Sequence, residues 1–134
     1  MKVISQNKKA KSDYFISNQL EAGIVLVGSE IKSILKNGVN LKESYVKIIN
    51  NEVFLINANI DDTDEKLRPK KLLLHKKQIK VYEKLLKNPG TTLLVTSVYV
   101  GNSGKVKCEV VLGKGKKQYD KRQAIKERDL ERQQ

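Results

Sequence analysis

The stretch YVKIINNEVFLINANI, residues 45–60, carries the clearest signal of the fold. Residues 45–49 are rich in β-prone side chains. The Asn50-Asn51 pair that follows suits a two-residue turn, because asparagine tolerates positive φ angles. Residues 52–60 are interpreted as the returning strand, so the stretch predicts a β-hairpin. The apolar residues that share one face of that strand are Phe54, Ile56, Ala58 and Ile60.

A second hairpin is predicted towards the C-terminal end. Residues 91–100 are rich in Thr, Val and Leu, and the sequence Gly-Asn-Ser-Gly at 101–104 indicates a turn. Residues 105–112 then alternate strictly between apolar and polar side chains, as a half-buried strand does. The residues predicted to face inward on this strand are Val106, Cys108, Val110 and Leu112.

Two short helices are predicted between the strands. Residues 30–38 show the i, i+3, i+4 apolar spacing of a helix that packs on a core. Ser29 can cap the start of this helix, and Gly38 can supply the left-handed residue that ends it. A second helix is predicted for residues 75–87, where His75 stands at the start and suits capping or packing better than proton transfer. The side chains predicted to hold the first helix on the core are Ile31, Ile34 and Leu35.

These elements favour a mainly β fold, because five or six strands occur in hairpins without any βαβ repeat. Residues 14–16 and 23–27 are also β-prone, with a bend or irregular strand between them. Such a chain is expected to close as a small antiparallel barrel of the oligonucleotide-binding (OB) type, flanked by two or three helices. The predicted organisation is a basic N-terminal arm at 1–12, the barrel at 13–113, and a basic C-terminal tail at 114–134 that is disordered on its own.

The charge of the chain indicates an anionic partner. The net charge is +12, the isoelectric point is about 9.8, and three segments, residues 1–11, 66–87 and 105–134, carry +4, +8 and +5. Basic segments that can converge in space are typical of proteins that bind polyanions, of which nucleic acid is the commonest. Aromatic residues make up only 5% of the chain, so recognition of RNA backbone and shape is favoured over base stacking.

Several kinds of site are excluded by the composition. A single cysteine, Cys108, permits neither an internal disulfide nor a thiolate zinc cluster, and a single histidine is too few for a metal site built from imidazoles. The acidic residues 61–65 lack the spacing of a calcium loop and are expected to be solvated. No catalytic constellation or phosphate-loop motif occurs, so no catalytic residue, metal or cofactor is predicted. Without an apolar run of about 20 residues or a signal core, the chain is expected to be cytoplasmic and to have no membrane contact.

The stretch GKGKKQYDKR, residues 113–122, directly follows the second hairpin. Glycine lets a backbone approach another surface and lysine supplies a mobile positive charge, which together suit a phosphate backbone. A solvated basic loop has the same composition, so both interpretations stay open at this point.

Six blocks along the chain together resemble one known family. Their order and spacing are similar to those of the SsrA-binding protein family over nearly the whole chain. The blocks are NKKAKSDYFI (7–16), EAGIVLVGSEIKSI (21–34), NLKESYVKI (40–48), EVFLINANI (52–60), KKLLLHKKQI (70–79) and GKGKKQYDKR (113–122).

The resemblance implies an RNA-binding barrel that holds transfer-messenger RNA by its tRNA-like domain. The family delivers this RNA, with elongation factor Tu as an indirect partner, to bacterial 70S ribosomes that have stalled without a stop codon. The tail would enter the empty mRNA channel of the small subunit and approach the rRNA of the decoding centre. A monomer is expected.

The resemblance also implies two sets of site residues. Glu21 is unusual among them, because a carboxylate repels phosphate. It either accepts hydrogen bonds from base amino groups or sugar hydroxyls, or is a satisfied carboxylate that shapes the bend. The implied RNA-binding set is Asn7, Lys8, Lys9, Glu21, Gly23, Leu72, Leu74, His75, Lys114, Lys116 and Lys117. The implied decoding-centre set is Tyr119, Asp120, Lys121 and Arg122.

Two other functions stay open. One is a basic protein that associates with ribosomal RNA constitutively, for which the residues of the tail would matter little. The other is an RNA-processing enzyme that uses Lys or Tyr chemistry, which no motif in the chain supports.

Overall fold

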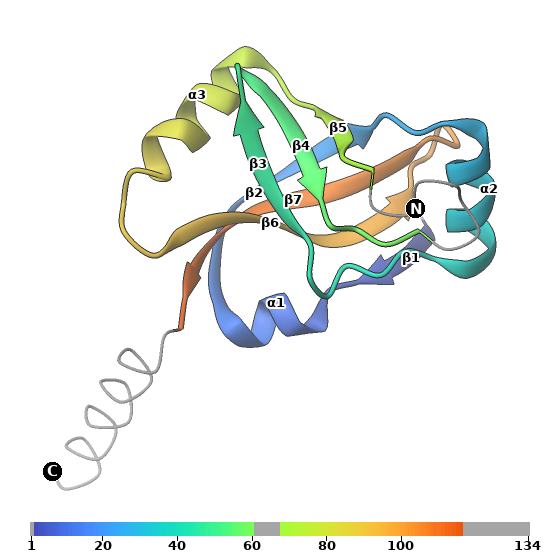
Figure 1. Cartoon of the computed structure of the whole chain (residues 1–134), viewed down its shortest axis with the longest axis horizontal. Coiled ribbons are helices and arrows are strands. Elements are labelled where there is room, and N and C mark those ends of the chain that lie inside the picture. Colours follow the sequence, from blue (N-terminus) through green and yellow to red (C-terminus); the bar gives the residue numbers. More distant parts are fainter. Residues whose placement is uncertain (1, 61–67, 117–134) are drawn as a thin grey trace, which may run out of the picture.

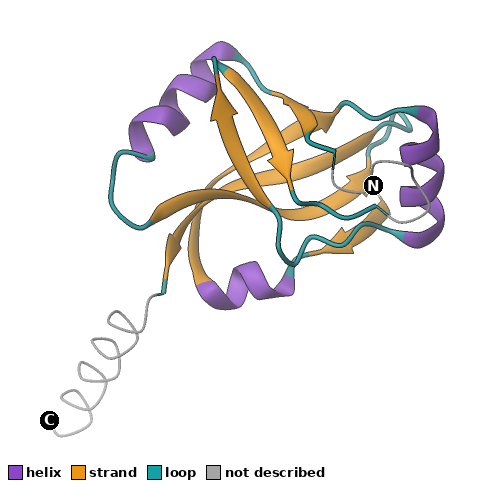
Figure 2. Ribbon diagram, viewed as in Figure 1, coloured by secondary structure: helices purple, strands orange, loops and turns teal. Residues whose placement is uncertain are grey.

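Alternating apolar residues and short turns produce seven strands and three helices in residues 2–60 and 68–116, the part of the chain that the computed structural model describes (Figure 1). Figure 2 shows the same view coloured by type of element. The strands are β1 (Lys2–Gln6), β2 (Tyr14–Ile24), β3 (Tyr45–Ile49), β4 (Glu52–Ile56), β5 (Lys70–Leu73), β6 (Thr91–Val100) and β7 (Val106–Gly115). The helices are α1 (Lys8–Asp13), α2 (Gly28–Asn37) and α3 (Lys76–Leu85).

Six of the strands close into an antiparallel barrel. Neighbours pair in the order β6–β3–β4–β5–β2–β7, and β7 pairs with β6 to close the cylinder. One edge of β6 pairs with two strands: Val46 of β3 lies opposite Leu93, and Lys2 of β1 lies opposite Val100. The prediction of a small closed antiparallel barrel flanked by helices is confirmed.

The first hairpin forms as predicted, but the returning strand has the other face inward. Asn50 and Asn51 form its turn with φ angles of 51° and 64°. In β4 the buried side chains are Val53 and Leu55, not Phe54 and Ile56. The strand ends at Ile56, and Asn57 then takes a φ of 60°, which changes the phase so that Ala58 and Ile60 are buried. A simple alternation over residues 52–60 could not predict this change, because it assumes an unbroken strand.

The residues predicted as a basic N-terminal arm contain a strand and a helix. Strand β1 lies along β6, and α1 follows it against the barrel. The side chain of Asn7, which is 5% exposed, accepts from the Ala10 N–H at 3.1 Å and donates to the Leu41 and Val95 carbonyls. The sequence of β1 shows no alternation of apolar and polar residues that would predict a strand, because β1 is an edge strand whose side chains are exposed or only half-buried.

Helix α2 has a different buried face from the predicted one. It begins at Gly28 with Val27 as its cap, so Ser29 does not cap it. Of the three predicted core residues only Ile34 is buried, and Ile31 and Leu35 are exposed. The residues that α2 buries are Glu30, Ser33 and Ile34.

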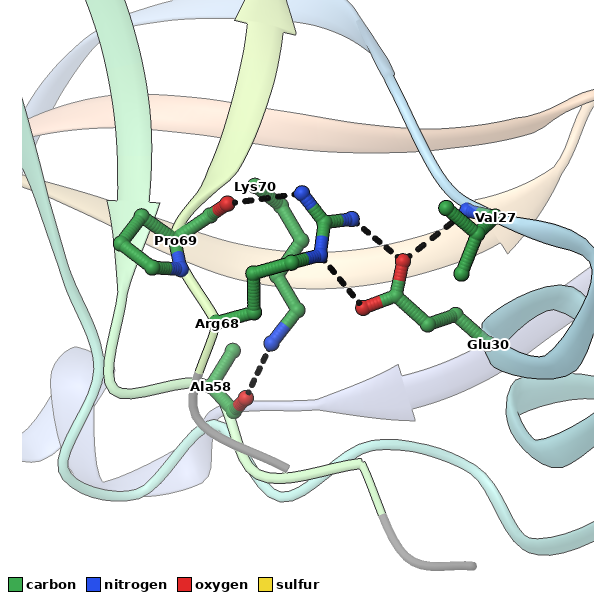
Figure 3. A network of polar contacts seen from close by, with 6 residues as sticks. All are labelled: Val27, Glu30, Ala58, Arg68, Pro69 and Lys70. Atoms are coloured by element: carbon green, nitrogen blue, oxygen red, sulfur yellow. Dashed lines mark hydrogen bonds and ion pairs between the residues drawn. The ribbon is translucent and has the colours of Figure 1, made fainter. Parts of the chain in front are cut away.

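A buried ionic network explains this rotation of α2. Figure 3 shows the carboxylate of Glu30 facing Arg68, which donates to it from Nη2 and, at 3.3 Å, from Nε. The Val27 N–H also donates to Glu30, at 2.9 Å. Burial would raise the pKa of the Glu30 carboxyl, but the hydrogen bonds from Arg68 and Val27 outweigh it and hold the pKa below its usual range. Nearby, the ammonium of Lys70 is buried and donates to the Ala58 carbonyl at 2.9 Å, and burial lowers its pKa.

Helix α3 is held on the barrel by Tyr82, whose hydroxyl donates to the Asn18 carbonyl at 2.6 Å. Asn18 has a φ of 53° and lies where the register of β2 against β7 shifts, between Ser17 and Leu20. The bend predicted between the two β-prone segments is therefore an irregularity within one long strand.

The predicted burial of Cys108 is confirmed, and burial raises the pKa of its thiol to about 12.

Candidate nucleic-acid interface

Predicted RNA-binding residues lie near both ends of β2. At one end Phe15 pairs with Lys114 of β7, and near the other Gly23 pairs with Lys107. Seven residues of extended strand separate Lys107 from Lys114, which corresponds to roughly 23 Å. The structure therefore divides the predicted surface into two patches. The Glu21 patch comprises Glu21, Gly23, Leu73, His75, Tyr99 and Lys107, and the α1 patch comprises Lys8, Lys9, Lys114 and Lys116.

The carboxylate of Glu21 is held by two side chains from neighbouring strands. Tyr99 of β6 donates its hydroxyl to Oε2 at 2.6 Å, and Lys107 of β7 donates its ammonium to Oε1 at 3.0 Å. These hydrogen bonds, that from Tyr99 first, hold the pKa of Glu21 below its usual range, so the carboxylate is ionised at neutral pH. Burial, and then the neighbouring Glu21, raise the pKa of Tyr99 above its usual range, so its hydroxyl remains a donor.

Glu21 nevertheless remains accessible, with 54% of its side chain exposed. A carboxylate can accept about four hydrogen bonds, and the protein uses two of them. The structure shows a satisfied carboxylate whose partners fix its orientation, and it leaves lone pairs that can accept from base amino groups or 2′-hydroxyls, so the two interpretations of Glu21 do not exclude each other.

The apolar residue of this patch is Leu73, not Leu72 or Leu74. Leu73 lies opposite Gly23 in the β2–β5 pair and is 55% exposed. Leu72 is 2% exposed in the core, and Leu74 packs against that core. The inward placement of Lys70 and Leu72 already puts Leu73 outward, so alternation within β5 was the signal that could have found it.

His75 lies at the N-cap position of α3 beside these residues. Its backbone N–H donates to Oε1 of Gln78 at 2.9 Å, while the imidazole makes no capping hydrogen bond and is exposed. A hollow of about 580 Å³ lies next to it and is lined by Leu73, His75, Lys71, Lys76 and Asn51, among others. His75 therefore lies at the start of the helix as predicted, but its side chain does not cap the helix through a hydrogen bond.

The α1 patch is built from lysines at the other end of β2. Lys8 and Lys9 are exposed on α1, and Lys9 lies 3.9 Å from Glu43. Asn7 was predicted to face RNA, but the structure buries it as the cap of α1, so it can act on RNA only by positioning the two lysines that follow it.

The glycines at 113 and 115 belong to the end of β7 rather than to a loop or a tail. Gly113 and Gly115 pair with Ile16 and Tyr14 of β2. A Cβ on Gly113 would lie 2.9 Å from Leu94 Cδ1, so close packing in the apolar cluster that Leu94 forms with Ala10 of α1 requires this glycine. Lys114 is exposed, and the Lys116 ammonium lies 4.9 Å from the centre of the Phe15 ring. Both lysines therefore present charge at the end of a rigid strand.

The remaining predicted residues lie outside the described part of the chain. They are Lys117, Tyr119, Asp120, Lys121 and Arg122.

Besides Leu73, sequence reasoning missed two further residues of the Glu21 patch, Tyr99 and Lys107. Alternation places Lys107 outward on its strand, but it cannot name the neighbour of that lysine. The neighbour depends on the register of β2 against β7, which brings Gly23 opposite Lys107. No signal in the sequence reports this register.

The arrangement suits recognition of RNA by backbone and shape. It combines fixed cations, an exposed acceptor and a small apolar surface, and these are the groups that contact phosphates, hydroxyls and base edges. Among residues 2–60 and 68–116 no group of three His, Cys, Asp or Glu side chains could hold a metal ion. In the same residues no helix is both long enough and apolar enough to cross a membrane.

Comparison with known proteins identifies the family. The model of the SmpB protein family matches residues 4–134. The SsrA-binding protein of Thermosipho melanesiensis is 46% identical over 139 residues, which span 98% of this chain and 95% of that protein. The SsrA-binding protein of Enterococcus hirae is 47% identical over 139 residues, spanning 98% and 90%. A solved structure described as "tmRNA-SmpB: a journey to the center of the bacterial ribosome" is similar with a TM-score of 0.68 and 30% identity, covering 85% of each chain. The chain belongs to the SmpB protein family, the SsrA-binding proteins.

Proposed function

We propose that this protein binds transfer-messenger RNA through its tRNA-like domain and delivers it to stalled bacterial ribosomes. The observation that carries the proposal is the Glu21 patch, a preorganised set of RNA-binding groups on the barrel of a chain that belongs to the SsrA-binding proteins. Relatives named for SsrA binding and a solved complex that names tmRNA and the ribosome support the same partners.

Each member of the Glu21 patch has a part in this proposal. The ammonium of Lys107 contacts phosphate, and the carboxylate of Glu21 accepts from amino or 2′-hydroxyl groups. Leu73 packs against an exposed sugar or base, and His75 lies beside it at the hollow next to α3. Tyr99 does not touch the RNA but holds Glu21 in position.

The α1 patch and the tail are assigned to the ribosome. Lys8, Lys9, Lys114 and Lys116 lie at the opposite end of β2, where they can contact a second RNA while the Glu21 patch is occupied. The basic tail that follows β7 enters the empty mRNA channel, and Tyr119 to Arg122 act at the decoding centre. Elongation factor Tu takes part through the RNA, and the protein acts as a cytoplasmic monomer.

The test is a binding titration at physiological salt with three RNAs: the tRNA-like domain, an ordinary tRNA and an unrelated hairpin. Strong preference for the first RNA is expected. Glu21→Gln should weaken binding of that RNA by about 10- to 100-fold, the loss expected for one or two hydrogen bonds to a charged group. Glu43→Gln removes the same charge from an exposed residue beside α1 and should leave this affinity unchanged.

Equal binding of all three RNAs would instead support a constitutive basic protein of the ribosome. The observation that favours this second function is the α1 patch, whose exposed lysines suit any RNA backbone.

A further inference from the structure

Helix α3 presents a stripe of lysines on one side. At 100° per residue, Lys76, Lys80, Lys84 and Lys77 fall within an arc of about 100°, on the side of the helix opposite the buried Tyr82. All four are exposed, and Lys87 follows in the turn after the helix. We call these five residues the α3 stripe.

No carboxylate pairs with the α3 stripe in residues 2–60 and 68–116. The basic residues that form ion pairs there are Lys9, Arg68, Lys71 and Lys107. Glu83 lies on the same helix but makes no ion pair with any of the five lysines. The positive charge of the stripe is therefore available to an anionic partner.

The α3 stripe is continuous with the Glu21 patch. Lys76 follows His75 directly and lines the same hollow of about 580 Å³ as His75 and Leu73. A smaller cleft of about 230 Å³ continues along the helix between Asn51, Lys76 and Lys80. Beyond it, Lys47 and Lys87 line a groove of about 600 Å³ beside the β3–β4 turn. The surface thus extends for about 16 Å, the length of eleven helical residues, away from the Glu21 patch.

We propose that the α3 stripe binds the sugar–phosphate backbone of a helix in the tRNA-like domain and extends the contact made by the Glu21 patch. The proposal rests on the proposed function, because it takes the Glu21 patch as the site of RNA recognition. Lysine is a flexible point charge, so a row of lysines can follow a phosphate backbone without a fixed geometry. Contacts of this kind contribute affinity and orientation but no sequence preference.

The experiment compares two matched double variants of the full chain. Lys80→Gln with Lys84→Gln removes two charges from the α3 stripe. Lys32→Gln with Lys36→Gln removes two charges at the same i, i+4 spacing from exposed positions on α2, which lies at the opposite end of the barrel (Figure 1). Affinity is measured from 50 to 400 mM salt, in one arm for the tRNA-like domain and in the other for isolated small ribosomal subunits. Circular dichroism checks that both variants are folded.

Each phosphate contact contributes roughly 0.9 to the slope of log affinity against log salt. We expect the α3 variant to lose roughly 1.8 of this slope and roughly 10- to 30-fold in affinity for the tRNA-like domain at 0.15 M salt. A loss confined to the small ribosomal subunit would contradict the proposal and identify ribosomal RNA as the partner of the stripe.

Two results would overturn the proposal. One is an unchanged slope for the α3 variant on the tRNA-like domain, and the other is an equal loss in the α2 variant. Failure of the proposed function has a separate signature, because the unmodified protein would then show no preference for the tRNA-like domain over an ordinary tRNA.

Discussion

Leu72 and Leu73 are neighbours in β5, but Leu72 is buried in the core and Leu73 is exposed. Substitutions at the two positions can therefore distinguish an effect on stability from an effect on RNA binding. Leu72→Ala removes a core side chain and should lower the free energy of unfolding by about 2–5 kcal/mol. Leu73→Ala truncates a side chain that is mostly in water, so it should change stability by less than about 0.5 kcal/mol and weaken binding of the tRNA-like domain. Urea unfolding and RNA titration of both variants measure the two effects. Loss of RNA affinity in the Leu72 variant alone, at a temperature where it is folded, would contradict the assignment of Leu73.

Gly113 and Gly28 provide a second comparison of single residues. A Cβ on Gly113 would lie 2.9 Å from Leu94 Cδ1 and 3.1 Å from Tyr14 Cδ1, so Gly113→Ala should destabilise the barrel by about 1–3 kcal/mol through overpacking. Gly28 has no atom within 4 Å of the same position and lies in the first turn of α2, where alanine is a better helix former. Gly28→Ala should therefore leave the melting temperature unchanged or raise it. A Gly113→Ala variant with an unchanged melting temperature would contradict the packing requirement at this position.

At the scale of elements, the network between Glu30 and Arg68 ties α2 to the start of β5. The pKa of Glu30 is lower in the folded protein than the value of about 4.3 in an unfolded chain, so its contribution to stability is present above that value. The contribution is lost as the pH falls through the lower, folded-state pKa. Glu30→Gln should reduce the free energy of unfolding at pH 7 by about 1–3 kcal/mol.

This cost should shrink as the pH falls from about 5 towards 3, because the carboxyl of the unmodified protein is then protonated as well. Chemical denaturation of both proteins at several pH values measures the difference. Glu43→Gln is the control, since 76% of the Glu43 side chain is exposed and its contact with Lys9 is 3.9 Å long. If the loss of stability in the Glu30 variant did not vary with pH, it would have to arise from packing and not from the charge of the carboxylate.

The elements themselves differ in how far the sequence predicts them. Both hairpins and α3 follow from local patterns, because turn residues and strict alternation act within ten residues of one another. The buried face of α2 does not, because Glu30 is drawn inward by Arg68, which lies 38 residues away in the chain. Strand β1 was missed for a similar reason, since its hydrogen bonds to β6 join residues about 90 positions apart and leave no apolar period behind.

For the whole molecule, the proposed function separates RNA binding by the barrel from action on the ribosome by the tail. Replacing Asp120, Lys121 and Arg122 together by alanine should leave affinity for the tRNA-like domain within about threefold, because one phosphate contact at most is lost from that complex. Peptide tagging on stalled ribosomes should be abolished in a reconstituted translation assay. A variant of Glu21 should instead bind the tRNA-like domain weakly, and it should lose tagging because it no longer holds that RNA. Equal loss of RNA binding and of tagging in the tail variant would contradict the separation of RNA binding by the barrel from action on the ribosome by the tail.

The sequence by itself determined the class of fold, the basic character of the surface and the resemblance to one family, because these depend on local patterns and on composition. Only the tertiary structure decided which of the predicted residues act together. It placed the lysines of α1 and Glu21 at different ends of β2, buried Asn7 and Leu72, and brought Tyr99 and Lys107 to Glu21. The physical reason is that a closed barrel sets the neighbours of a side chain through strand register and curvature, and both arise from pairings between segments far apart in the chain.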